Sequence, residues 1–203
     1  MPATASVSIK TLFAPFDDTT QAFLDFVSGA QKSLDINIYG FHLPALTDML
    51  IAKHKAGVHV SLILDHSQEA GKAEQSEVQK LLDAGVPLLI GTSPVHGQIL
   101  HSKFTVVDGR AVEHGSWNYS LSASLQSNDM HFVEHVEYAS AYLAHHNAIR
   151  SFILLHEMAY QPKDEIAAPA ADVPASDTDA LPSPASPVRI HRKRTPKKAT
   201  VAA

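Results

Sequence analysis

Short segments rich in β-branched residues alternate with amphipathic segments along the first half of the 203-residue chain. Apolar residues recur at every second position in the first kind and every three or four positions in the second, as in strands and helices. We expect strands at residues 8–13, 33–41, 58–65, 86–90 and 130–136, and helices after Asp17, after Pro44, before Gly85, and over 119–126 and 138–160. This alternation predicts an α/β sandwich with a largely parallel sheet.

A further strand and a turn are predicted between residues 99 and 110. Residues 99–107 are rich in β-branched and aromatic residues, which favours a strand. The dipeptide Asp108-Gly109 follows, and both residues tolerate the positive φ angles of a tight hairpin turn. A two-residue loop would pair Val107 with Arg110, whereas a three-residue loop would shift the pairing by one residue.

The two-residue loop would gather polar side chains on one face of this hairpin. It places Lys103 opposite His114, and His101 opposite Ser116. Because side chains alternate between faces along a strand, these four residues would share one face. Asp108 has the opposite parity and lies in the turn. A histidine, an ammonium group and a hydroxyl on one patch suit a phosphate ligand, although His114 could equally pack within the hairpin.

Six residues of this region have fixed spacing, in the pattern His-x-Lys-x4-Asp-x6-Gly-Ser-x-Asn. The pattern resembles the signature of the phospholipase D superfamily. Residues 36–41 and 82–87 resemble corresponding segments of small, single-motif phospholipase-D-type endonucleases from bacteria. The resemblance covers about residues 7–160, and it implies a mixed, largely parallel sheet flanked by helices on both faces.

The resemblance also implies a mechanism and an assembly. In that family two chains each supply one motif to a shared, metal-independent site, so the single copy here implies a homodimer without a cofactor. One His101 would attack phosphorus to form a phosphohistidine. The partner's His101 would protonate the leaving oxygen and later activate water.

The remaining motif residues have implied roles around the phosphate. Lys103, Ser116 and Asn118 would hold its non-bridging oxygens. The family places an acidic residue, usually Glu, after this motif to orient the histidine, and Asp129 occupies that position although its side chain is one methylene shorter. Asp108 belongs to the motif, but its side chain would face away from His101 and Lys103 and it lies in the turn. This position indicates that it orders the hairpin and the neighbouring backbone.

Composition changes sharply at residue 162. Residues 162–203 are rich in Pro and Ala, and we expect them to form a disordered tail that follows a domain of residues 1–161. This tail has 7 basic and 5 acidic residues, which leaves 9 basic and 16 acidic residues in the domain. The last fifteen residues carry six of the basic residues and no acidic one, so they could contact nucleic acid or an anionic surface, or only keep the chain in solution.

Other features exclude several classes of function. The chain has no cysteine, and its thirteen histidines do not form a recognisable ligand set such as His-Glu-x-x-His, so we expect no metal site. The first residues lack the pattern of a signal peptide, and no apolar segment approaches the ~20 residues that cross a bilayer. We therefore expect a cytoplasmic protein without stable membrane association.

The resemblance and the basic end of the chain favour a nuclease that hydrolyses nucleic-acid phosphodiester bonds, although the acidic charge of residues 1–161 counts against nucleic-acid binding. Two alternatives remain open. The same chemistry could act on a phospholipid such as cardiolipin, although the acidic domain would repel an anionic bilayer. A dimer with this fold could also bind nucleic acid without turnover.

Overall fold

The computed structural model describes residues 7–69 and 72–156. The expected tail, residues 162–203, lies outside the described residues. The elements follow one another as β1 (Ser8–Ala14), α1 (Thr19–Ser28), β2 (Ser33–Ile38), β3 (Phe41–His42), α2 (Pro44–Lys55), β4 (His59–Asp65), α3 (His66–Glu69), α4 (Lys72–Asp83), β5 (Leu88–Gly91), β6 (Phe104–Val107), β7 (Ala111–Gly115), β8 (Tyr119–Ser120), a 3-10 turn η1 (Ala123–Leu125), β9 (Asn128–Glu134) and α5 (Val136–His156).

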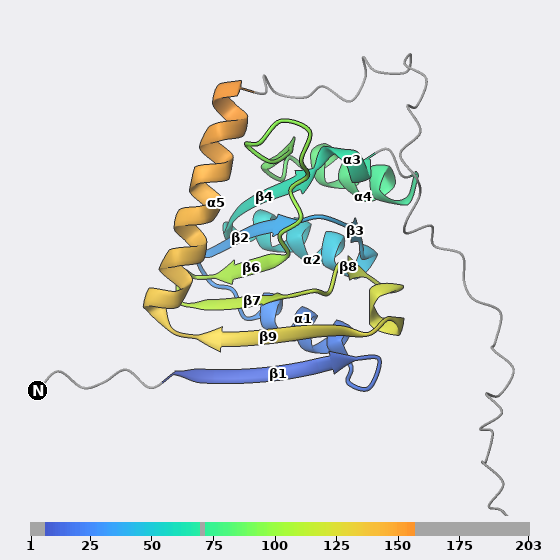
Figure 1. Cartoon of the computed structure of the whole chain (residues 1–203), viewed down its shortest axis with the longest axis vertical. Coiled ribbons are helices and arrows are strands. Elements are labelled where there is room, and N and C mark those ends of the chain that lie inside the picture. The colour runs from blue at the N-terminus through green and yellow to red at the C-terminus, as the bar shows by residue number, and fades with distance from the viewer. Residues whose placement is uncertain (1–6, 70–71, 157–203) are drawn as a thin grey trace, which may run out of the picture. The chain divides into compact units, whose positions relative to one another are not determined.

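Seven of these strands form one mixed sheet, in the order β1-β9-β7-β6-β2-β4-β5 (Figure 1). The predicted mixed α/β fold is confirmed, but the sheet is less parallel than expected. Only the β2–β4 and β4–β5 pairs are parallel, while the other four pairs are antiparallel. The helical crossovers that parallel pairing requires occur only in the first half of the chain, and the second half contributes hairpins instead.

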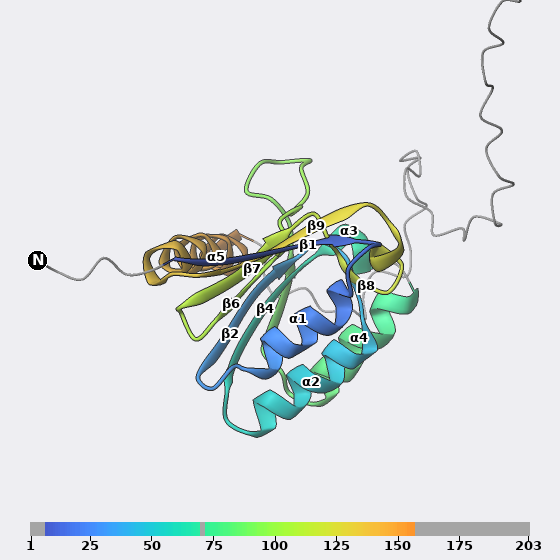
Figure 2. The ribbon, with the colours of Figure 1, turned by 90° about the horizontal axis from the view of Figure 1, so that it is seen from below.

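Helices cover both faces of the sheet, as expected. Figure 2 shows α1, α2 and α4 on one face and α5 on the other. The main core lies under the three helices and contains fully buried aromatic side chains, among them Phe23, Phe41, Trp117 and Tyr119. Smaller apolar clusters lie under α5. The candidate motif therefore lies in a sheet that is held in place from both sides.

Local chemistry explains where the first helices begin. The Asp18 carboxylate accepts a hydrogen bond from the Gln21 backbone N–H (3.0 Å) and so caps α1. Pro44 is the first residue of α2, where its missing N–H costs no hydrogen bond. Helix α2 packs against both α1 and β4.

The structure corrects the predicted strand over residues 99–107. Only Phe104–Val107 form β6, so His101 and Lys103 precede the regular strand. The turn closes through a hydrogen bond from the Arg110 N–H to the Val107 carbonyl (3.0 Å), and Asp108 and Gly109 have positive φ, as predicted.

The pairing beyond this turn differs from the prediction. Val107 is paired with Ala111 rather than Arg110, which shifts the register by one residue. His114 is consequently opposite Phe104 instead of Lys103. The prediction that residues 119–126 form a helix is also wrong, because they contain the short strand β8 and the η1 turn.

Candidate active site

The residues of the motif gather at one edge of the sheet. Strands β2, β4 and β7 end at this edge, while β6 and β9 begin there, as their pairing registers require. Connecting segments at the ends of these strands carry His101, Lys103, Ser116 and Asn118, and Asp129 is the second residue of β9. Different parts of the chain therefore supply one polar site, which is the usual arrangement for functional side chains on a rigid sheet.

Tyr39 lies between the two basic residues of the motif. Its ring centroid is 4.7 Å from that of His101 and 5.1 Å from the Lys103 ammonium nitrogen. The same ammonium group donates a hydrogen bond to the His101 carbonyl (2.9 Å). Lys103 is 7% exposed, and this burial lowers its pKa to about 8. At neutral pH the site thus keeps a poorly hydrated cation, which is well suited to attract a phosphate.

Asn118 is held by the residue that follows Tyr39. Its side-chain oxygen accepts a hydrogen bond from the Gly40 N–H (3.3 Å), and the Tyr119 N–H donates to the Gly40 carbonyl (3.0 Å). A Cβ atom at Gly40 would lie 3.3 Å from the Asn118 side chain, so a larger residue would press against it. Tyr39 and Gly40 therefore join the two halves of the motif.

Ser116 and Asp129 form a hydrogen-bonded pair across β7 and β9. The Ser116 hydroxyl donates to the Asp129 carboxylate, and the Asp129 N–H donates back to that hydroxyl (3.0 Å). Gly115 makes this approach possible, because a Cβ atom there would lie 2.3 Å from the Asp129 carbonyl oxygen. The second carboxylate oxygen of Asp129 lies 2.8 Å from His131 Nε2.

These contacts settle the charge of the Asp129 carboxylate. The hydrogen bond from Ser116 lowers its pKa most, partial burial opposes this, and the contact with His131 lowers it further. The pKa of Asp129 therefore lies below its usual value, and the group is an anion at neutral pH. An anion at this position accepts hydrogen bonds from the hydroxyl and imidazole groups beside it.

Asp108 lies at the other end of β6. Its carboxylate accepts hydrogen bonds from the backbone N–H groups of Gln31, Lys32 and Ser33, at 2.7–3.1 Å. Partial burial raises the pKa of Asp108, but these three donors outweigh it and hold the pKa below its usual value. The contacts join the β6–β7 turn to the start of β2, away from His101.

Sequence reasoning missed two acidic residues near this edge. The Asp65 carboxylate, at the end of β4, accepts a hydrogen bond from the Leu100 N–H (2.6 Å) and so fixes the segment that leads to His101. Its place at the end of a buried strand, in the sequence Leu-Asp-His, was the available signal. Glu113 is fully buried in β7, and burial raises its pKa to about 8.

His114 does not line the phosphate patch with Lys103. Its Nε2 lies 2.9 Å from the Tyr138 hydroxyl of α5, and its ring stacks on His131 at a centroid distance of 5.1 Å. The shifted register explains this, because it turns His114 toward α5. Within residues 7–69 and 72–156, no group of three His, Asp or Glu side chains has the geometry to hold a metal ion.

A known protein family matches most of the described chain. Residues 23–149 match the family described as "Cardiolipin synthase, PLD-like domain". The chain belongs to the phospholipase D superfamily. The match includes the whole motif and most of the strands that carry it. A mitochondrial cardiolipin hydrolase from Xenopus laevis is 35% identical over 123 residues, which cover 59% of this chain and 56% of that protein.

Further phospholipase D proteins are also similar. A phospholipase D from Rickettsia bellii is 29% identical over 136 residues, which cover 66% of this chain and 65% of that protein. The crystal structure of the phospholipase D family member Nuc from Salmonella typhimurium has a TM-score of 0.65 and 25% identity, with 70% and 93% of the two chains covered. The chain spans 46–56% of the length of three similar cardiolipin hydrolases.

Proposed function

We propose that the protein is a metal-independent phosphodiesterase that hydrolyses nucleic-acid phosphodiester bonds. The observation that carries this proposal is the single sheet edge at which His101, Lys103, Ser116, Asn118 and Asp129 meet. The edge offers an imidazole nucleophile, a poorly hydrated cation and hydrogen-bonding groups within one patch. Together these suit attack on a phosphate and stabilisation of its transition state.

The proposed reaction has two steps. In the first, a ring nitrogen of His101 forms a bond to phosphorus, and the bond to the leaving oxygen breaks as that oxygen takes a proton from the partner's His101. In the second, the partner's His101 removes a proton from water, and the resulting oxygen displaces His101 from phosphorus. One histidine must start neutral and the other protonated, so kcat/KM should have a bell-shaped pH profile.

In this proposal Lys103 and Asn118 bind the non-bridging oxygens, and Ser116 joins them when its hydroxyl hydrogen turns from the Asp129 carboxylate to the phosphate. Asp129 is a positioning residue, which orients Ser116 directly and His101 as the family resemblance implies. Asp108 takes no part in the reaction itself, because its carboxylate already accepts three backbone N–H groups. Its contribution is to hold β6 in place.

The site as proposed is completed by a second copy of the chain. Large apolar side chains are exposed in the connecting segments at the same edge, namely Phe16 (91%), Ile99 (43%), Leu121 (61%) and Leu125 (70%). Exposed apolar groups around a polar half-site are typical of a surface that another chain covers. They support a homodimer in which the two motifs face each other.

A phospholipid substrate is the second candidate, since the similar proteins include cardiolipin hydrolases and phospholipases D. The apolar side chains at the edge could also contact lipid. No helix in the described parts of the chain is both long and apolar enough to cross a bilayer. The acidic charge of residues 1–161 would repel nucleic acid and an anionic membrane alike, so the nucleic-acid candidate relies on the basic residues of 189–198 and on the resemblance to single-motif endonucleases.

A substrate panel in EDTA tests both candidates. Wild type should cleave plasmid DNA, single-stranded DNA or RNA, and leave vesicles of cardiolipin and phosphatidylcholine intact. His101→Ala should lose at least about a thousandfold in rate while it keeps the dimer, as measured by light scattering. Cleavage of cardiolipin alone would replace the nucleic-acid proposal, and normal turnover by His101→Ala would refute the mechanism.

A further inference from the structure

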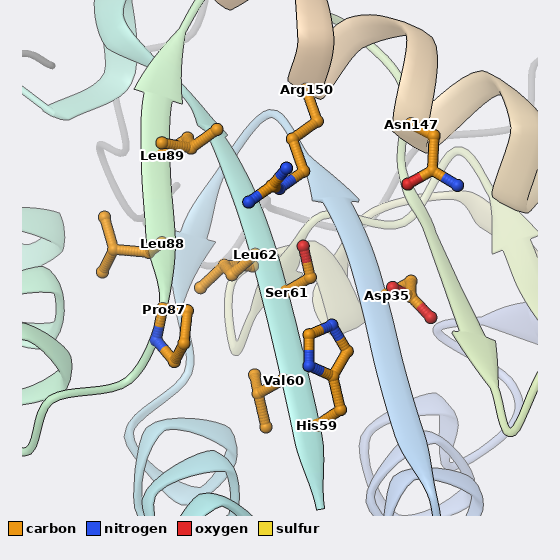
Figure 3. Close-up of a pocket in the computed structure, with 10 residues that line it drawn as sticks. All are labelled: Asp35, His59, Val60, Ser61, Leu62, Pro87, Leu88, Leu89, Asn147 and Arg150. Carbon is orange, nitrogen blue, oxygen red and sulfur yellow. The ribbon is translucent and has the colours of Figure 1, made fainter. Parts of the chain in front are cut away.

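A second polar cavity lies away from the candidate active site, on the face of the sheet that α5 covers (Figure 3). Its volume is about 330 Å³, and β2, β4, β5 and α5 form its walls. His59 is the first residue of β4, and Asp35 is the third residue of β2. The cavity is therefore near the starts of these strands, whereas the motif is near their ends.

One residue of the lining, Ser61, belongs to a buried polar network. His146 of α5 is fully buried, with Nε2 at 2.8 Å from the Ser61 hydroxyl and Nδ1 at 2.6 Å from the Asn37 side-chain oxygen. Because that amide oxygen can only accept, Nδ1 donates to it, and Nε2 accepts from Ser61. Burial is the main reason that the pKa of His146 falls to about 4, so the ring is neutral at physiological pH.

Groups that can donate hydrogen bonds surround the opening. Figure 3 shows the Arg150 guanidinium reaching from α5 over Ser61, with the His59 ring on the other side of that hydroxyl. In the described part of the chain, no carboxylate lies within ion-pair distance of Arg150. The Asn147 amide, also from α5, adds a neutral donor at the rim.

Asp35 is the one acidic side chain in the lining. It is 6% exposed, and burial raises its pKa, although a hydrogen bond with Ser33 and the charge of His59 oppose the shift. Burial thus disfavours its charged form, and any charge that remains on Asp35 opposes an anion in the cavity.

We propose that this cavity is a binding site for a phosphate monoester. The phosphate group would lie between the Arg150 guanidinium and the His59 imidazole, and Asn147 would donate to one of its oxygens. Inorganic phosphate alone would leave most of the volume empty. The substituent would therefore pack against Pro87 and Leu89, which form the apolar wall opposite Asp35. This site is independent of the proposed function of the motif.

Amide NMR titrations of the full chain test the proposal, with inorganic phosphate and phenyl phosphate as probes. Both should shift the amides of Ser61 and Asn147, and phenyl phosphate should also shift those of Leu88 and Leu89. Its Kd should be at least about tenfold lower than that of phosphate because the phenyl group packs on the apolar wall. Shifts confined to Ser116 and Asn118 would mean that the motif alone binds phosphate, which would refute the second site.

Substitutions at the cavity sharpen the test. Arg150→Gln should weaken phenyl phosphate binding at Ser61 about tenfold or more, because a charged, bidentate donor is lost. Arg110→Gln is the matched control, since Arg110 is an exposed arginine beside Glu134 and does not line this cavity. Equal affinities in the two variants would overturn the assignment of Arg150.

Asp35→Asn should strengthen phenyl phosphate binding, in contrast to Arg150→Gln. The substitution removes the carboxylate charge but keeps the size of the side chain, so the affinity should rise severalfold at pH 7.5. A weaker affinity, with an unchanged amide spectrum elsewhere, would show that Asp35 binds a cationic or neutral donor group of the ligand and that the phosphate assignment is wrong.

Discussion

At the scale of single residues, the candidate site contains charged groups whose burial lowers the stability of the fold. Lys103 is the clearest case, because its ammonium group is buried and faces the ring of Tyr39 and a carbonyl rather than a carboxylate. A cation–π contact offsets part of the lost hydration. The lowered pKa of Lys103 reflects the part of the lost hydration that this contact does not offset. A bound phosphate would offset that part by pairing with the ammonium group.

Lys103→Met should therefore separate stability from activity. Methionine has a similar length and no charge, so we expect the free energy of unfolding at pH 7 to rise by about 1–2 kcal/mol. Activity should fall at least about a hundredfold, because the phosphate loses its cation. Urea unfolding and initial rates measure the two effects. A variant that is both less stable and fully active would contradict this account of Lys103.

Glu113 predicts a dependence of stability on pH. Its pKa is raised from 4.5 to about 8 in the folded protein, so the folded state binds a proton that the unfolded chain releases between these values. The stabilisation is complete below about pH 4.5 and is lost as the pH rises toward 8. Glu113→Gln, which mimics the protonated form, should have a flatter profile than wild type.

The measurement is urea unfolding at several pH values between about 5 and 8. The difference in unfolding free energy between Glu113→Gln and wild type should grow by about 1–3 kcal/mol over this range. Glu134→Gln is the control, because Glu134 is an exposed residue of the neighbouring strand. Parallel profiles for Glu113→Gln and wild type would mean that Glu113 is already ionised at pH 5.

At the scale of elements, the turn between β6 and β7 fixes the motif in the sheet. Asp108→Ala would leave three backbone N–H groups of residues 31–33 without their acceptor, so the free energy of unfolding should fall by about 2–3 kcal/mol. At a temperature where the variant is folded, kcat should fall far less than in His101→Ala. Thermal melts and initial rates would distinguish this role from a catalytic one.

Asp108→Asn provides the intermediate case, because its amide oxygen can still accept one or two of these hydrogen bonds. Its stability should lie between those of wild type and Asp108→Ala. If Asp108→Ala unfolds normally and loses all turnover, Asp108 takes part in the reaction and the structural role proposed for it is wrong.

Much of the fold could be predicted from the sequence, because the periodicity of apolar residues is a local property. The position of Asp108 in a turn also followed from its neighbours and from parity. Its three backbone partners could not be foreseen, because they depend on the packing of β2 against β6, some seventy-five residues apart in sequence. The same holds for the contact of Tyr39 with His101.

The register of the β6–β7 hairpin shows a different limit of prediction from local sequence. Asp108-Gly109 correctly indicated a tight turn, but the extra residue Arg110 shifted every pair beyond it by one position. A shift of one residue exchanges the faces of a strand, so the predicted partnership of Lys103 with His114 failed. Pairing with β9, which fixes where β7 lies, is a long-range contact that local patterns do not encode.

At the scale of the whole molecule, the proposed dimer predicts how mixed subunits behave. If each active centre needs two His101 residues, a heterodimer of wild type and His101→Ala should be inactive. Equal amounts of the two chains, after complete exchange, should then retain about one quarter of the wild-type rate instead of one half. A value near one half would mean that each chain works alone.

The pairing of β1 with β9 has a consequence for the synthesis of the protein. Ser8 is opposite Glu134, so β1 finds its partner only after nearly all of the described chain has been made. Until then, β1 has unpaired backbone groups and exposed apolar side chains, which can associate with other chains. A ribosome-bound chain that stops before β9 would therefore lack Asp129 and the strand that pairs with β1. A chaperone bound to β1 would protect it during that interval.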